Sequence, residues 1–139
     1  MSHSPILIVE DEDDVLEMMV DCLRAEGYRV VPARSSTEGV AQLVRCHPSL
    51  VILDLTLPWL EGPAFARVLR RMKVEAPILV VSGLHDVAER AKAIGAAGHL
   101  PKPFELDALL AEVRRLHPVT SPAGQPSLGL PGRPVLGTI

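Results

Sequence analysis

The sequence has few aromatic residues and lacks any long apolar run. Aromatic residues make up 3% of the 139 residues, whereas hydrophobic residues as a whole make up 47%. A core must therefore be built mainly from valine, leucine, isoleucine and alanine, which suits parallel strands that are buried on both faces. No apolar run approaches the roughly 20 residues that a transmembrane helix needs, so we expect no membrane partner.

The sequence also lacks a basic excess, a cysteine motif and a signal peptide. Its net charge of −3 argues against the basic surface with which proteins bind nucleic acid. Cys22 and Cys46 are not spaced as metal ligands, and residues 1–5 have neither the basic nor the apolar region of a signal peptide. We therefore expect a cytoplasmic protein with reduced thiols, no direct contact with nucleic acid, and one main domain.

What the sequence does contain is an alternation of short apolar runs with longer segments of helical periodicity. The runs predict strands over residues 6–9, 28–32, 50–53, 78–81 and 97–101. The apolar stripes that predict helices are Val15, Met18, Met19, Cys22 and Leu23; Val40, Leu43 and Val44; Phe65, Val68, Leu69 and Met72; Val87, Ala88, Ala91 and Ile94; and Leu106, Leu109, Leu110, Val113 and Leu116. Right-handed helical crossovers between parallel strands then predict an α/β, doubly wound sheet with helices on both faces.

Several helix and strand ends are also marked in the sequence. Gly27 is placed to end the first helix, and Ser35 or Ser36, with Glu38 close behind, to begin the second. Pro32 and Pro101 lack the N–H that a central strand would use, so the second strand is expected to lie at a sheet edge or to stop at Pro32, and the fifth strand is expected at an edge. The stretch 54–63 is predicted to be a loop because it contains two prolines and a glycine.

Charged residues follow three of the predicted strands. Glu10 and Asp11 come directly after the first strand, Asp54 after the third, and Lys102 after the fifth. Because the carboxyl ends of parallel strands lie together at one edge of an open sheet, these side chains are expected to share a pocket. Crowded carboxylates repel one another, and oxygen ligands suit Mg²⁺. The pattern therefore predicts a site for Mg²⁺ and for an anion such as phosphate.

The order and spacing of these residues resemble the receiver domain of two-component response regulators, the CheY-like superfamily, over roughly residues 5–116. The shared features are the acidic pair Glu10-Asp11, the acceptor position Asp54, the loop from Leu57-Pro58 to Gly62, the hydroxyl residue Ser82, and Lys102-Pro103 followed by Phe104. Each motif alone is weak, but their joint order on this strand–helix pattern is specific. The resemblance implies a (βα)5 flavodoxin-like sandwich with strand order 2-1-3-4-5.

The resemblance also implies how the pocket works. Asp54 would accept a phosphoryl group from a sensor histidine kinase or a phosphotransfer protein, acting as a carboxylate nucleophile. Glu10, Asp11, Asp54 and the backbone carbonyl of Thr56 would hold Mg²⁺. Lys102 and Ser82 would bind the phosphoryl oxygens. The protein would then be a switch with intrinsic phosphotransfer and autodephosphorylation only, rather than an enzyme.

The resemblance also implies a switch at the surface around the fifth strand. His99 stands where the family often carries a rotating tyrosine or phenylalanine, and Ser82 would couple the phosphoryl group to it. The surface expected to change is formed by the fourth helix, the fifth strand and the fifth helix. That surface would contact an output or a partner, and homodimerisation through it is left open.

Other interpretations of the same residues are kept. A phosphohydrolase with an aspartate nucleophile commonly needs a second acid two residues on, where this chain has Thr56. A flavin carrier needs a phosphate loop that the acidic run from Glu10 to Asp14 would repel. A receiver that acts by binding alone is also open. Three of the residues also have a simpler interpretation. Ser82 could be an ordinary turn serine, His99 an edge-strand histidine, and Lys102 a surface lysine.

The C-terminal residues differ in composition from the rest. Residues 118–139 are rich in proline and glycine and contain one charged residue, Arg133. Such a composition does not continue a helix and is typical of a linker or tail. We therefore divide the chain into a receiver domain over residues 1–117 and a linker or tail over residues 118–139. No output domain is visible, so the chain is either a single-domain regulator or a receiver from a longer protein.

Overall fold

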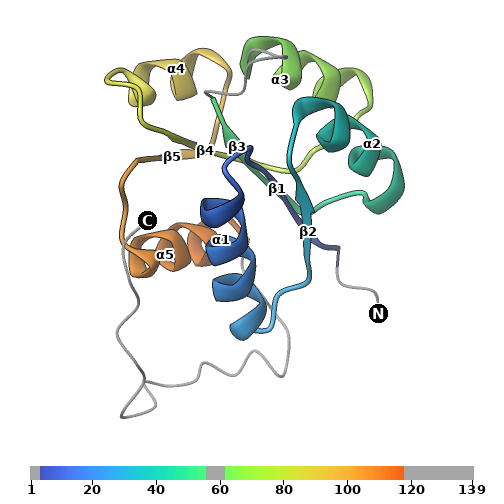
Figure 1. Ribbon diagram of the computed structural model, residues 1–139. Coiled ribbons are helices and arrows are strands. Elements are labelled where there is room, and N and C mark those ends of the chain that lie inside the picture. Colours follow the sequence, from blue (N-terminus) through green and yellow to red (C-terminus); the bar gives the residue numbers. More distant parts are fainter. Residues whose placement is uncertain (1–3, 56–61, 118–139) are drawn as a thin grey trace.

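A computed structural model describes residues 4–55 and 62–117 and shows strands and helices in strict alternation (Figure 1). The strands are β1 (Ile6–Val9), β2 (Val30–Ala33), β3 (Leu50–Asp54), β4 (Ile78–Ser82) and β5 (Gly98–Pro101). The helices are α1 (Asp13–Ala25), α2 (Ser36–Cys46), α3 (Gly62–Arg71), α4 (Val87–Ala93) and α5 (Leu106–Leu116). The predicted succession of strand–helix units is therefore confirmed.

All five strands are parallel and lie in the order β2-β1-β3-β4-β5. This is the predicted order: β2 lies on one side of β1, and β3, β4 and β5 follow on the other side. The proline-containing strands β2 and β5 are the two edges, as their missing N–H groups predict. At the centre, Ile8 pairs with Ile52, which pairs with Leu79, so three apolar side chains lie across the middle of the sheet.

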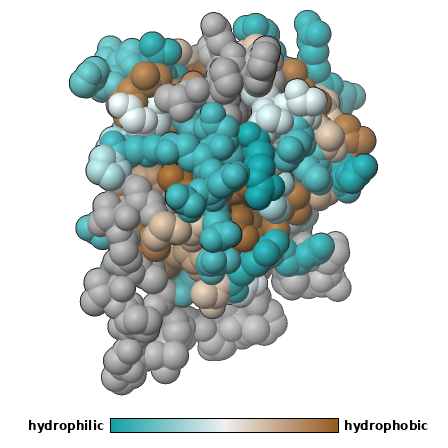
Figure 2. Space-filling view, viewed as in Figure 1, coloured by the Kyte–Doolittle hydropathy of each residue, from teal (hydrophilic) through white to brown (hydrophobic). Residues whose placement is uncertain are grey.

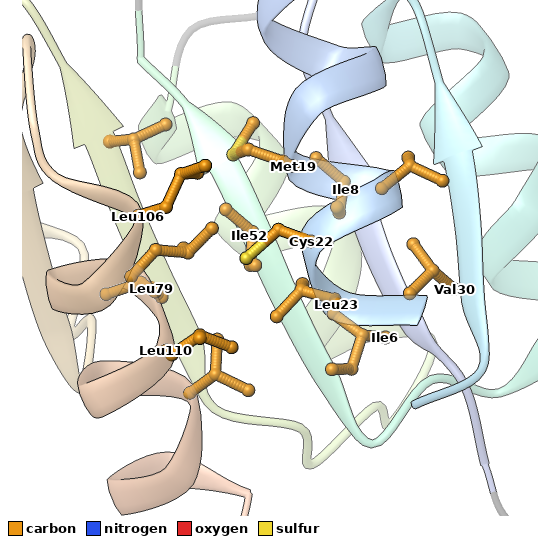
Figure 3. Close-up of a cluster of buried hydrophobic side chains, with 14 of the residues drawn as sticks. Ile6, Ile8, Met19, Cys22, Leu23, Val30, Ile52, Leu79, Leu106 and Leu110 are labelled. Atoms are coloured by element: carbon orange, nitrogen blue, oxygen red, sulfur yellow. The ribbon is translucent and has the colours of Figure 1, made fainter. Parts of the chain in front are cut away.

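Helices cover both faces of the sheet (Figure 1), and the sheet separates the core into two apolar layers. On one face α1 and α5 pack against the strands, and Figure 3 shows Met19 and Leu23 of α1 with Leu106 and Leu110 of α5 around Ile52 of β3. The other layer contains Leu43 of α2, Phe65 and Leu69 of α3, and Val87 and Ala91 of α4. Alternate residues of each strand enter alternate layers, as the pleat of a β-strand requires.

The ends of α1 and α2 follow the predicted signals. Ser35 is the N-cap of α2, and its Oγ accepts a hydrogen bond of 3.1 Å from the Glu38 N–H. The Glu38 carboxylate in turn accepts from the Arg34 N–H at 2.9 Å, which completes a capping arrangement. Gly27 follows α1 with a φ of +95°, a left-handed conformation that glycine adopts without strain.

Several details of the sequence prediction are wrong. The exposed fraction is 39% for Met18 and 61% for Val44, which were expected to face inward. In α1 the buried residues are Leu16, Met19, Val20, Cys22 and Leu23, so Met19, Cys22 and Leu23 of the predicted stripe are confirmed, whereas Leu16 and Val20 are buried instead of Met18. Both stripes have helical spacing, so only packing against the sheet selects between them.

The other differences concern element boundaries. Strand β2 covers Val30–Ala33 instead of residues 28–32, and α3 already begins at Gly62, inside the predicted loop. Both are one- or two-residue shifts at the ends of elements, where sequence signals are weakest. In the part of the chain that the structure describes, no helix is long and apolar enough to cross a membrane. The predicted linker over residues 118–139 lies outside the described residues and stays a prediction.

Candidate functional site

The site lies at the carboxyl edge of the sheet, where the strands deliver polar residues side by side. Glu10 follows β1, Asp54 ends β3, Ser82 ends β4 and Lys102 follows β5. Three of these side chains are almost completely buried, with exposed fractions of 0% for Glu10, 1% for Asp54 and 0% for Ser82. The local reason is the strand pattern: Glu10 directly follows the fully buried β1, and Asp54 and Ser82 are the last residues of β3 and β4, in which every residue is buried.

The charged residues continue the apolar layer that α1 and α5 cover. Ile8, Ile52 and Leu100 all belong to this layer, and each is followed two residues later by a charged residue of the site, in the order Glu10, Asp54, Lys102. Side chains two residues apart in a strand point to the same face. The same spacing places Ser82, two residues after Val80, in register with the opposite layer. The site is therefore the polar end of an otherwise apolar layer.

Lys102 is the centre of this arrangement. Its Nζ lies 2.9 Å from Glu10 Oε1, 3.1 Å from Glu12 Oε1 and 3.3 Å from Asp54 Oδ2. The Lys102 side chain is 14% exposed and the Glu10 and Asp54 side chains are 0% exposed, so these charges have little water around them. Buried charges are stable only when paired, and the single ammonium here is shared among the three carboxylates.

The electrostatics of the pocket disfavour the charge on Glu10. Burial raises the pKa of the Glu10 carboxyl to about 7, since the attraction of Lys102 does not offset desolvation and the repulsion of Asp54. For Lys102, burial acts to lower the pKa, but contacts with Glu10 and the charge of Asp54 outweigh it and the pKa is raised. The pocket thus has more negative charge than its one ammonium neutralises.

One buried oxygen in the pocket is poorly satisfied. Glu10 Oε1 has no hydrogen bond of acceptable geometry among the described residues, although Lys102 Nζ approaches it closely. The other oxygen, Oε2, accepts a hydrogen bond of 3.2 Å from the Glu12 N–H. A close charge with poor hydrogen-bond geometry leaves Glu10 Oε1 free to take a further electrostatic partner.

The carboxylates that converge are Glu10, Glu12 and Asp54. Their oxygens lie within 4.8 Å of one another, which is the geometry of a group that can hold a metal ion. Asp11, which was predicted as a ligand, is exposed and does not belong to this group in the structure. Glu12 was not singled out in the sequence. The sequence carries no clear signal for it, because Glu12 lies in the turn between β1 and α1.

The remaining predicted residues are placed differently from one another. Ser82 Oγ accepts a hydrogen bond of 3.0 Å from the Leu84 N–H, so it is held in the turn that follows β4. His99 lies on β5 and is exposed, between a half-buried Gly98 and a buried Leu100. The Lys102–Pro103 peptide bond is cis. Thr56 lies outside the described residues, so its predicted carbonyl ligand stays a prediction.

The donor set fits a hard divalent cation. Mg²⁺ prefers carboxylate and carbonyl oxygens and retains several waters, and the pocket offers grouped carboxylate oxygens with excess negative charge. The buried Glu10 Oε1 without an adequate hydrogen bond is a further observation in favour, because a cation would satisfy it. An acidic pocket of this kind at the switch point of an open α/β sheet is where such folds bind ligands.

Comparison with known proteins decides the family. Residues 6–114 match the model of the response regulator receiver domain. The chain belongs to this family. As a receiver domain of two-component signalling, it is similar to the response regulator MprA of Mycobacterium sp. (strain KMS), with 38% identity over 119 residues. That match covers 84% of this chain and 52% of MprA, so the chain spans about half the length of the relative.

Other relatives and solved structures agree with this assignment of the receiver domain. The transcriptional regulatory protein YkoG of Bacillus subtilis is 34% identical over 116 residues, covering 82% of this chain and 51% of YkoG. The receiver domain from Bermanella marisrubri has a TM-score of 0.75 and 33% identity, covering 83% of this chain and 98% of that one. The HemR receiver domain of Leptospira biflexa has a TM-score of 0.75 and 30% identity, covering 86% and 98%.

Proposed function

We propose that this receiver domain accepts a phosphoryl group on Asp54. The observation that carries the proposal is a buried carboxylate, Asp54, whose Oδ2 lies 3.3 Å from the ammonium of Lys102 in a pocket lined by further acids. The Asp54 carboxylate oxygen attacks the phosphorus of a phosphohistidine. An O–P bond forms, the P–N bond breaks, and the imidazole leaves and takes up a proton. This is nucleophilic chemistry of a kind that aspartate performs elsewhere.

Charge neutralisation is what the pocket contributes to this transfer. An anionic nucleophile and an anionic phosphoryl group repel each other, so the reaction depends on positioning and on electrostatic stabilisation. The Lys102 ammonium is already beside Asp54 and is available to a phosphoryl oxygen. The Ser82 hydroxyl accepts from Leu84 and still has its own hydrogen to donate.

We propose Mg²⁺ as the metal, held by Glu10, Asp11, Asp54 and the backbone carbonyl of Thr56. When bound, Mg²⁺ would supply positive charge to the transferring phosphoryl oxygens. Glu10 and Asp54 are buried in the pocket, whereas Asp11 faces solvent in the structure. Asp11 would therefore serve as a ligand from the open side of the site, where bound waters complete the coordination.

The partner in this proposal is a sensor histidine kinase or a phosphotransfer protein in the cytoplasm. Phosphorylation adds a charge of about −1.5 to −2 at neutral pH, and Ser82, Lys102 and nearby N–H groups gain an acceptor. The expected response is a shift of the face formed by α4, β5 and α5, with exposed His99 as the switch residue. This face would contact an output or a partner, and a homodimer through it is one form that the contact can take.

Labelling with acetyl phosphate tests the proposal directly. We expect the wild-type protein with Mg²⁺ to gain one phosphoryl group, observed by mass spectrometry, and we expect Asp54→Asn to gain none. Asp14→Asn is the matched control, because it removes an exposed acid of α1 while leaving the pocket intact. Labelling of Asp54→Asn would overturn the acceptor assignment. An unlabelled wild-type protein would support a receiver that acts by binding alone.

A further inference from the structure

Glu12 occupies a position that the proposed phosphotransfer does not use. It is the N-cap residue of α1, yet its side chain makes no capping hydrogen bond. Its carboxylate instead points to the pocket, with Oε1 3.1 Å from Lys102 Nζ, while its N–H donates to Glu10 Oε2 at 3.2 Å. Glu12 therefore contacts both the ammonium and the buried carboxylate beside it.

The three partners of Lys102 differ in their exposure to water. The Glu10 and Asp54 side chains are 0% exposed, whereas the Glu12 side chain is 63% exposed. In the structure the ammonium lies where it neutralises the buried pair. A divalent cation bound to that pair would repel the ammonium, which must then move away from Glu10. Glu12 is the carboxylate that can hold it on the open side of the pocket.

We propose that Glu12 is a positioning residue for Lys102. Its carboxylate gives the ammonium a second anchor, which would keep Lys102 beside Asp54 if a cation replaced the ammonium at Glu10. The inference rests on the proposed function, since it concerns the same pocket. It assigns Glu12 a contact with Lys102 rather than with the metal or the phosphoryl group.

The neighbouring acids show that Glu12 is more than an acidic start of a helix. Acids near a helix N-terminus are stabilised by the helix dipole, and Asp13 and Asp14 fill that role in the first turn of α1. Asp13 forms an ion pair of 2.7 Å with Arg34, on the side of β2. Glu12 differs from Asp13 and Asp14 because its carboxylate contacts Lys102 and belongs to the group of converging carboxylates.

A double-mutant cycle on Mg²⁺ binding tests this role without any need for catalysis. Dissociation constants are measured by NMR titration with MgCl2 for the wild type, Glu12→Gln, Lys102→Met and the double variant. We expect Glu12→Gln to weaken binding about two- to fivefold, the range of a single solvent-exposed ion pair. We expect Lys102→Met to bind more tightly than the wild type because the competing ammonium is gone. In that background Glu12→Gln should have little further effect.

Two variants keep the test decisive if Lys102→Met fails to fold. Asp14→Asn removes one negative charge from the same turn of α1. The logarithm of the dissociation constant should change less than half as much in Asp14→Asn as in Glu12→Gln. Glu12→Asp keeps the charge but shortens the reach, and should weaken binding nearly as much as Glu12→Gln. Equal effects of Glu12→Gln and Asp14→Asn, with full rescue by Glu12→Asp, would overturn the inference.

The cycle also separates the inference from the proposed function. If the wild type binds Mg²⁺ and Glu12→Gln weakens binding equally with and without Lys102, Glu12 is a metal ligand or a distant charge, and only the inference fails. If the wild type binds no Mg²⁺ at millimolar concentration, the proposed metal pocket itself is wrong and the inference fails with it.

Discussion

The middle of the sheet and its carboxyl edge are built from the same strands but do opposite things. In the middle, Ile8, Ile52 and Leu79 are fully buried and pair across β1, β3 and β4. Two residues further along β1 and β3, the chain places Glu10 and Asp54, which are equally buried but charged. Burial stabilises the first group and destabilises the second, because an apolar side chain gains from leaving water and a charge does not.

This difference shows that the candidate site and the stabilising core lie in separate parts of the sheet. The apolar middle holds the strands in register, and that register brings the charged ends together at the edge. The edge contributes little to stability, since one ammonium is shared among three carboxylates. The residues that stabilise the fold and the residues that form the site therefore lie about two positions apart along each strand. Single substitutions can test the two groups separately.

The largest expected effect is on stability, from a change in the middle of β3. Ile52→Ala should lower the free energy of unfolding by about 2–5 kcal/mol, the range for a large-to-small substitution in a packed core. Asp54→Asn, two residues on, should keep it within about 1 kcal/mol of the wild type, because the side chain keeps its size and the Lys102 ammonium keeps Glu10 and Glu12 as partners. Urea unfolding monitored by circular dichroism measures both. Similar losses for the two variants would contradict the separation of the two regions.

The second prediction concerns the pH dependence that the edge imposes. The pKa of Glu10 is raised from 4.5 to about 7, so the folded protein binds this proton more tightly than the unfolded chain does. The stability associated with Glu10 is therefore full below about pH 4.5 and is lost as pH rises through about 7. Glu10→Gln should remove this dependence and exceed the wild type in stability at pH 8 by roughly 3 kcal/mol, at about 1.4 kcal/mol per pKa unit.

Unfolding curves at several pH values without metal measure this difference. Asp14→Asn serves as the control, because it removes an acid of α1 that lies in solvent. If Glu10→Gln and the wild type differ by the same amount at pH 5 and at pH 8, the raised pKa is not a property of the folded protein.

Most of the fold could be predicted from the sequence because its signals are local. The apolar runs and helical stripes depend on spacing alone, and prolines at positions 32 and 101 identified the edge strands β2 and β5. The exposed positions of Met18 and Val44 could not be predicted in this way. Two overlapping stripes in α1 satisfy the same periodicity, and the choice between them depends on how the helix packs on the sheet.

The candidate site was partly predictable for a related reason. Glu10, Asp54 and Lys102 follow strands, and parallel strands bring their carboxyl ends together. Glu12 lies in the turn between β1 and α1, where the direction of a side chain depends on backbone angles that the sequence does not specify. The structure places the Glu12 carboxylate beside Lys102 and leaves Asp11 outside the group of converging carboxylates. Whether Asp11 is a metal ligand stays a prediction.

Bound Mg²⁺ should neutralise the negative charge of the carboxyl edge and so stabilise the folded protein. A ligand that binds only the folded state stabilises it by about 1.4 kcal/mol at ten times its dissociation constant. Mg²⁺ should therefore raise the melting temperature more at pH 8 than at pH 6, where a protonated Glu10 competes with the cation. EDTA should reverse the effect. The variant Glu10→Gln should lose the pH dependence of this stabilisation, whereas Ile52→Val should retain it, and equal stabilisation at both pH values would contradict the prediction.

The smallest expected effect comes from a polar residue at the same edge that serves the fold instead of the site. Ser35 follows β2, and its Oγ accepts the Glu38 N–H at the start of α2. Ser35→Ala should cost about 1 kcal/mol of unfolding free energy, and Ser35→Gly only a few tenths, as for other N-caps. Acetyl phosphate labelling of Asp54 should be unchanged in both variants, because Ser35 Oγ accepts from Glu38 and forms no hydrogen bond or ion pair with the described residues of the pocket. A loss of labelling would mean that the carboxyl edge works as a single unit and that its polar residues cannot be divided between folding and binding.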